Sequence, residues 1–214
     1  MEIYDKHYLT KKYSTLFKKV ELVTINRLSN FFGQAQHESK LKPTVESLNY
    51  DLNGLLKNFS RDRISTLDAQ KYCRTAVRKA DQEKIANLIY GGAWGLKNLG
   101  NKFYGDGWRF RGRGLFQITG RANYEALTKW VKKVLGLDVD YVNNPDLLLN
   151  EADSLIGAFW YWSTRNLNTY ADKNDILSIS KIINLGNVNS KATPKGLEER
   201  ILQTKNFEKL FKAT

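Results

Sequence analysis

The sequence predicts a mainly α-helical fold, and three observations support this. Apolar residues recur at intervals of three and four along several segments, which is the period of an amphipathic helix. Strand candidates are few and short. The 214 residues are 42% hydrophobic and include only 3 prolines, with no Gly-, Ser- or Pro-rich linker. We therefore expect a single domain that spans residues 1–214.

Two segments have the clearest apolar faces. Segment 20–39 places on one face the residues Ile25, Leu28, Phe32 and Ala35. Glu38 lies one turn beyond that face. The second segment begins at the helix-start signal Asn144-Pro145-Asp146, and its apolar stripe consists of Leu148, Ala152, Ile156, Phe159 and Trp160. Further helices are expected at 66–80, 82–90, 122–135, 175–185 and 197–211. Region 91–120 holds nine of the 15 glycines and is expected to be loop-rich, with at most a small β-hairpin.

The composition restricts the possible functions. A formal net charge of +12 predicts attraction to polyanions, either nucleic acid or an anionic cell wall, although a solubilising surface would give the same charge. The single cysteine, Cys73, excludes an intramolecular disulfide, and we interpret it as a partly buried small thiol rather than a nucleophile. The N-terminal segment lacks the apolar stretch of a signal peptide, and no run approaches the ~20 apolar residues of a membrane span. We expect a protein made in the cytoplasm with no integral membrane segment.

Two carboxylates stand eight residues apart, in Gln36-His37-Glu38-Ser39 and in the segment from Glu46 to Tyr50. Glycoside hydrolysis uses one carboxylic acid to protonate the leaving oxygen and, in inverting enzymes, a second carboxylate to activate water. A helix end followed by a returning loop can provide the gap between the two groups. On spacing alone, two exposed surface glutamates are the simpler interpretation.

A metal site is the competing interpretation of the His-Glu pair. Metallopeptidase helices carry His-Glu-x-x-His, but here the fifth position is Leu41 and the other histidine of the chain is His7. We therefore expect no metal site. His37 is expected to have a structural hydrogen-bonding role rather than to take part in the chemistry.

The block 105–124, GDGWRFRGRGLFQITGRANY, is the second informative segment. Its arginines and glycines superficially resemble RNA-binding segments, but ordered apolar residues flank a single short run. Phosphate-loop and dinucleotide-binding spacings are absent from it.

The segments AQHES, ESLNY, KIANLIYGG, the 105–124 block, NNPDLL and KIINLGN occur in the order seen in glycoside hydrolase family 19. Over about residues 28–200 the chain resembles the chitinase-like enzymes of that family, most closely its bacteriophage endolysins. The resemblance implies a lysozyme-like α-helical fold with a substrate cleft, hydrolysis with inversion at the anomeric carbon, and no cofactor.

The resemblance also implies roles for individual residues. Glu38 corresponds to the general acid and Glu46 to the candidate base, and Thr119 positions the water. Substrate-binding roles fall on Gln117, Asn123, Asn184 and Arg200, of which the arginine also tunes the acidic centre. Three aromatic residues are either sugar-facing or buried in the core: Tyr50, Trp108 and Tyr124.

The expected activity is that of an endolysin that cleaves the β-1,4 bond between N-acetylmuramic acid and N-acetylglucosamine in peptidoglycan. Such an enzyme would act as a monomer at the bacterial cell wall after release from the cytoplasm, with no nucleic-acid partner and no separate wall-binding module. An endochitinase would share every catalytic residue and act on chitin instead. A third possibility is a non-catalytic protein that binds the wall or nucleic acid through its basic surface.

Overall fold

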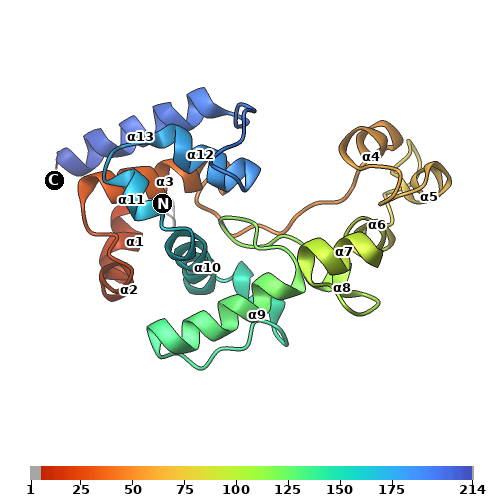
Figure 1. The fold of residues 1–214 in the computed structure, drawn as a ribbon, viewed down its shortest axis with the longest axis horizontal. Coiled ribbons are helices and arrows are strands. Elements are labelled where there is room, and N and C mark those ends of the chain that lie inside the picture. Colours follow the sequence, from red (N-terminus) through yellow and green to blue (C-terminus); the bar gives the residue numbers. More distant parts are fainter. Residues whose placement is uncertain (1–5, 214) are drawn as a thin grey trace.

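Helices dominate the computed structural model, which describes residues 6–213 (Figure 1). The α-helices are, in chain order, α1 (Lys6–Lys12), α2 (Ser14–Lys19), α3 (Ile25–Ser39), α4 (Leu52–Asn58), α5 (Thr66–Tyr72), α6 (Gln82–Ile89), α7 (Gly92–Leu99), α8 (Asp106–Arg109), α9 (Arg121–Trp130), α10 (Glu151–Thr164), α11 (Leu167–Ala171), α12 (Ile176–Leu185) and α13 (Leu197–Lys212). A π-helical turn, Val131–Leu135, follows α9, and a 3₁₀ turn, Pro145–Leu149, precedes α10. Extended pairing in the described residues is limited to isolated bridges. The predicted mainly α-helical fold class is confirmed.

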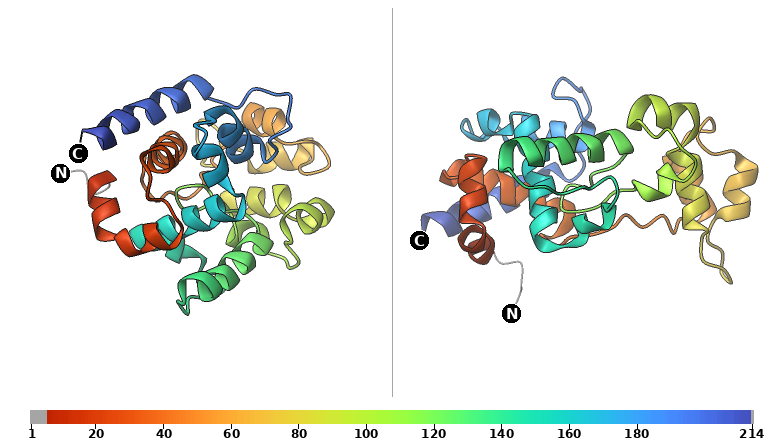
Figure 2. Two further views of the ribbon diagram at one scale, coloured as in Figure 1. Left: turned by 60° about the vertical axis from the view of Figure 1, so that its left-hand side comes forward. Right: turned by 90° about the horizontal axis from the view of Figure 1, so that it is seen from below.

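The helices form two groups (Figures 1 and 2). The smaller group contains α4 to α8, and the larger contains α1 to α3 and α9 to α13. Two non-helical segments, 40–51 and 110–120, run between the groups and pair through the bridge from Val45 to Arg113. These connecting segments carry many of the polar residues that the sequence singles out.

An aromatic core fills the larger group around α3 and α10. Its centre is made of the buried side chains Phe17, Phe31, Phe32, Phe159 and Trp162. The Phe31 ring lies 5.4 Å from the ring of Trp162 and 5.5 Å from that of Phe159, between centroids. Aromatic side chains bury large areas and gain further from edge-to-face contacts. This core therefore fixes α3, the helix that carries Glu38.

The smaller group has an apolar cluster of its own, built from Leu48, Leu55, Ile64, Ala69, Cys73, Ala80, Ile85, Ala86 and Ile89. Cys73 is a buried free thiol, as predicted. A third cluster lies along α9 and the outer face of α10 and includes Phe110, Tyr124, Tyr141 and Trp160.

Helix α3 crosses α13 at very short range. A Cβ atom on Gly33 would lie 2.7 Å from the Cα atom of Thr204, so only glycine permits this approach.

Helix α3 begins at Ile25, later than the predicted residue 20, because the Thr24 hydroxyl accepts a hydrogen bond from the N–H of Arg27 and caps the helix. The predicted helices 82–90, 122–135, 175–185 and 197–211 are confirmed to within a few residues.

One sequence-based prediction is wrong and another is incomplete. The helix predicted at 66–80 ends at Tyr72, because Cys73 is extended and the N–H of Arg74 bonds to the carbonyl of Tyr50 instead. The region 91–120 is mostly non-helical, as predicted, but it also contains α7 and α8, which were not predicted. Across residues 6–213, no helix has the length and apolar character required to span a bilayer.

Candidate functional site

Glu38 lies in the last turn of α3 and is held by an arginine from α13. The Nη2 group of Arg200 donates a hydrogen bond of 2.5 Å to Oε1 of Glu38. The Arg200 side chain is 1% exposed, whereas that of Glu38 is 23% exposed. The carboxyl group is therefore fixed on its protein side and accessible on the other.

Arg200 is itself fixed by groups that the sequence analysis missed. Its Nη1 donates to Oε1 of buried Gln34 at 2.6 Å, and its Nε donates to the carbonyl of Lys195 at 3.0 Å. Gln34 in turn donates to the hydroxyl of Ser180 at 3.0 Å. A buried guanidinium requires such partners for its N–H groups. The network locks the arginine into one orientation toward Glu38.

Glu46 lies on segment 40–51 and receives two hydrogen bonds. The hydroxyl of Tyr90 donates to Oε1 at 2.6 Å, and the N–H of Gly112 donates to Oε2 at 3.2 Å. Burial, and then the negative charge of Glu46, raise the pKa of Tyr90 well above its usual range. The phenol therefore remains a hydrogen-bond donor to the carboxylate near neutral pH.

The polar residues predicted beside Glu46 gather around Gly112. A Cβ atom at this position would lie 2.8 Å from Oε1 of Gln117, 3.2 Å from the hydroxyl of Thr119 and 3.4 Å from Cβ of Glu46. Thr119 donates to the carbonyl of Gln117 at 2.9 Å, and Asn123 donates to the carbonyl of Thr119 at 2.7 Å. The structure thus brings together four predicted residues, namely Glu46, Gln117, Thr119 and Asn123.

The ring of Tyr161 lies close to Glu38 and to the segment that carries Gln117. Burial raises the pKa of Tyr161, and the nearby charge of Glu38 also raises it, whereas the guanidinium of Arg165 lowers it; burial has the largest effect, and the pKa is raised overall. The same ring packs edge-on against Phe116 at 5.7 Å, next to Gln117 in the chain. Tyr161 was not predicted, because it stands in a row of aromatic residues in α10 and no motif distinguishes it from its neighbours.

His37 and Asn184 act around the start of α13. Nδ1 of His37 lies 2.8 Å from Oε2 of Glu199, and Oδ1 of Asn184 accepts the N–H of Lys195 at 2.8 Å. Both contacts fix the backbone that presents Arg200. In the part of the chain that the structure describes, no group of three or more His, Cys, Asp or Glu side chains is placed to hold a metal ion.

The three predicted aromatic residues have different environments. Tyr50 is half-buried against the ring of Phe59, and burial together with the charge of Glu46 raises its pKa. The ring of Trp108 lies beneath the guanidinium of Arg111, at 3.5 Å. Tyr124 is 0% exposed, and burial raises its pKa to about 12. Its ring has no face open to a sugar, which corrects the sugar-facing interpretation and favours a core role.

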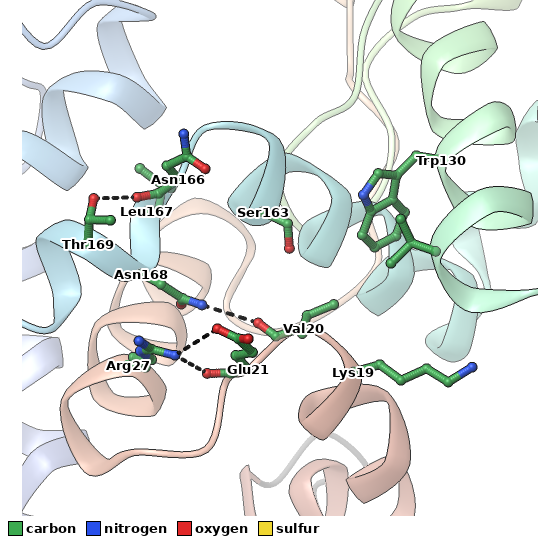
Figure 3. Close-up of a pocket in the computed structure, with 11 residues that line it drawn as sticks. Lys19, Val20, Glu21, Arg27, Trp130, Ser163, Asn166, Leu167, Asn168 and Thr169 are labelled. Carbon is green, nitrogen blue, oxygen red and sulfur yellow. Dashed lines mark hydrogen bonds and ion pairs between the residues drawn. The ribbon is translucent and has the colours of Figure 1, made fainter.

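A separate cavity of about 350 Å³ lies near the N-terminal end of α3 (Figure 3). Arg27, which lines it, precedes Glu38 by eleven residues on the same helix, or about 16 Å at the helical rise. Glu21 is the sole carboxylate among its lining residues, and it accepts hydrogen bonds from Arg27. This cavity contains none of the predicted catalytic residues.

Comparison with known proteins adds independent information. No family model matches the chain. A glycosyl hydrolase family 19 domain-containing protein of Haemophilus influenzae is 36% identical over 180 residues, which cover 81% of this chain and 78% of that protein. An acidic endochitinase of Petunia hybrida is 37% identical over 76 residues, which cover 35% of this chain and 26% of the chitinase. The extent of the first match shows that this chain belongs to glycoside hydrolase family 19.

Proposed function

We propose that this protein hydrolyses the β-1,4 bond between N-acetylmuramic acid and N-acetylglucosamine in bacterial peptidoglycan, as an endolysin does. One observation carries the proposal: two carboxyl groups are each held by dedicated donors, Glu38 by Arg200 and Glu46 by Tyr90 and Gly112. A pair of positioned carboxyl groups is what glycoside hydrolysis requires.

In the proposed reaction Glu38 is the general acid and transfers its proton to the glycosidic oxygen as the bond to the anomeric carbon breaks. Glu46 is the base and takes a proton from the water that attacks this carbon from the opposite face. Thr119, whose hydroxyl lies beside Gly112, positions that water. Such single displacement inverts the anomeric configuration and requires the two carboxyl groups to lie about 6.5–9.5 Å apart.

The charge of the protein supports an anionic substrate. A formal net charge of +12 attracts the chain to the anionic polymers of a bacterial wall and accelerates encounter with them. We propose that the enzyme works at the bacterial cell wall, as a monomer, after release from the cytoplasm.

Endochitinase activity is the second candidate, and the partial match to the Petunia hybrida acidic endochitinase favours it. Both activities cut a β-1,4 bond between N-acetylated sugars. They differ in whether the binding sites accept the lactyl ether and peptide of N-acetylmuramic acid.

Mass spectrometry of the fragments released from purified peptidoglycan, after borohydride reduction of the new ends, tests the proposal. We expect reduced muramic acid at the ends, and no release by Glu38→Gln. Glu83→Gln, at an exposed position of α6, is the matched control and retains activity. Cleavage of chitin oligomers alone would assign the chitinase activity instead, and release by a folded Glu38→Gln protein would contradict the role of Glu38.

A further inference from the structure

A second cavity, of about 600 Å³, lies against the block 103–121 and contains neither Glu38 nor Glu46. Four arginines contribute to its walls: Arg109, Arg111, Arg113 and Arg121. Its carboxylates are Asp106 and Asp146. The mechanism proposed above uses none of these side chains.

This cavity and the carboxylate site lie on opposite faces of one extended segment. Side chains alternate between the faces of an extended chain. Gly112 faces Glu46, Gln117 and Thr119, whereas its neighbours Arg111 and Arg113 line the cavity. A ligand in the cavity is therefore separated from the reacting bond by the thickness of the backbone.

Two of the four arginines are already neutralised. Arg113 donates to Asp146 at 2.8 Å, and Arg121 donates to Asp106 at 2.6 and 2.8 Å. In these two ion pairs the arginine charges balance the charges of both carboxylates in the cavity wall. The pairs therefore shape the cavity without adding net charge to it.

The other two arginines retain their positive charges. Arg109 donates to the backbone carbonyls of Val142 and Asn143, and Arg111 donates to the carbonyl of Trp108. Carbonyl groups satisfy N–H groups but carry no full charge. Asp140 acts on the charge of Arg109, and Asp146 and Glu46 act on that of Arg111, only at longer range. Among the described residues, neither guanidinium forms a direct ion pair with a carboxylate, so the cavity keeps two cationic groups free to pair with a bound anion.

Arg111 also has a hydrogen-bonding group without a partner. Its Nε is buried and has no hydrogen-bond acceptor among the residues that the structure describes. Burial and the neighbouring charge of Arg113 lower the pKa of Arg111, so its charged form is held at a cost that a bound anion would reduce.

Exposed aromatic rings stand at the rim of the same cavity. Phe103 is 66% exposed and Tyr104 is 84% exposed, although large apolar side chains are usually covered. Flat rings at a polar cavity are suited to the apolar faces of sugars, while guanidinium groups bind carboxylates through paired hydrogen bonds. A carboxylated glycan combines both features.

We propose that this cavity is a binding site for the carboxylate groups of a peptide-substituted glycan, separate from the catalytic carboxylates. Arg109 and Arg111 bind the carboxylate, and Phe103 and Tyr104 contact the sugar. The choice of peptidoglycan as the natural source of this ligand rests on the proposed function. The site would hold one part of the wall polymer while another part is cut.

Isothermal titration calorimetry with a muramyl dipeptide, which has a carboxylate and no glycosidic bond to cut, tests the site. The variant Arg109→Gln/Arg111→Gln is expected to bind this probe about tenfold more weakly, since charge-assisted hydrogen bonds are lost. The single variant Arg109→Gln provides a milder change at an exposed position, should the double variant unfold. Arg61→Gln is the matched control, because Arg61 is exposed and also donates to two backbone carbonyls, those of Leu56 and Phe59.

Unchanged affinity in folded Arg109 and Arg111 variants would overturn the site, as would an equal loss in Arg61→Gln. Tighter, arginine-dependent binding of glycerol phosphate would overturn the assignment to carboxylates. Peptidoglycan cleavage by the wild type is measured separately. Cleavage without arginine-dependent binding refutes this inference alone, and arginine-dependent binding without cleavage refutes the proposed function alone.

Discussion

Arg200 and Glu38 are joined by a hydrogen bond of 2.5 Å between Nη2 and Oε1, across 162 residues of chain. The arginine is buried and also bonds to Gln34 and Lys195, so its position depends on the packing of α13 against α3. The orientation of the proposed acid is therefore set by the tertiary fold rather than by its own helix.

Replacement of Arg200 by methionine should affect both stability and turnover. Loss of the buried guanidinium leaves Oε1 of Glu38 and Oε1 of Gln34 without this donor, which we expect to lower the free energy of unfolding by about 3 kcal/mol. Misplacement of the acid should lower kcat about 100-fold. Denaturant titration and initial rates test this. Arg27→Met removes the ion pair with Asp172 at the other end of α3 and should reduce stability without this loss of kcat. Equal kcat in both variants would refute the orienting role.

The hydroxyl of Tyr90 is expected to matter for Glu46. Tyr90→Phe removes one of the two donors to this carboxylate, so kcat should fall about tenfold with little change in fold. Tyr8→Phe, which removes the hydroxyl of a 40% exposed side chain in α1, serves as the control. If the two variants turn over substrate at the same rate, the contact does not position the base.

The close crossing at Gly33 gives a prediction about packing. Gly33→Ala places a methyl group against the backbone of Thr204 and should cost about 2 kcal/mol of stability while displacing Arg200. Gly157→Ala in α10 is the control, because its added methyl group meets a flexible Leu148 side chain at 3.2 Å. Thermal unfolding compares the two variants, and an equal effect would show that the crossing is not specially restrictive.

The Asp106–Arg121 pair predicts how stability depends on pH. Burial acts to raise the pKa of Asp106, but hydrogen bonds from Arg121 and from two backbone N–H groups outweigh it and hold the pKa below 3.8. Because the pKa of Asp106 is lower in the folded than in the unfolded state, its carboxylate adds stability at pH values above the unfolded-state pKa. This stability is lost as the pH falls through the folded-state pKa. Asp106→Asn should thus cost about 3 kcal/mol at pH 7 and progressively less below pH 4.

Denaturant titrations at several pH values test this prediction. The control Asp138→Asn removes a pair whose side chains are 75% and 92% exposed, and it should have little effect at any pH. A stability difference for Asp106→Asn that is independent of pH would contradict the assignment of the charged pair.

Local patterns identified much of the fold. Helices α12 and α13 were predictable because Gly186 and Gly196 flank clear apolar periods. Helix α7 was missed because its glycines lower helix propensity, and only its packing in the folded protein compensates for this. Helix α5 was predicted too long, since its end depends on the contact between Arg74 and Tyr50.

The site was predictable only where a motif marked it. Glu38, Glu46 and the residues around Gln117 stand in recognisable segments. Gln34 lies outside these segments, and Tyr90 lies in KIANLIYGG, which does not reveal its role. Both roles come from contacts over 166 and 44 residues of chain that no local pattern shows. Tyr124 was assigned a possible sugar contact because periodicity does not distinguish a ring that faces a ligand from one that faces the core.

Proton NMR of the first sugar anomer formed at a new reducing end tests whether Glu38 and Glu46 catalyse a single displacement. The substrate is a soluble fragment of peptidoglycan, or a chitin oligomer if the enzyme cuts only chitin. Spectra are recorded during hydrolysis, before mutarotation interconverts the anomers. If Glu38 is the acid and Glu46 activates water in a single displacement, the α anomer appears first from the β-linked substrate, and neither Glu38→Gln nor Glu46→Gln forms it at an appreciable rate. Initial formation of the β anomer would show a double displacement and contradict the role of Glu46 as the base that activates water.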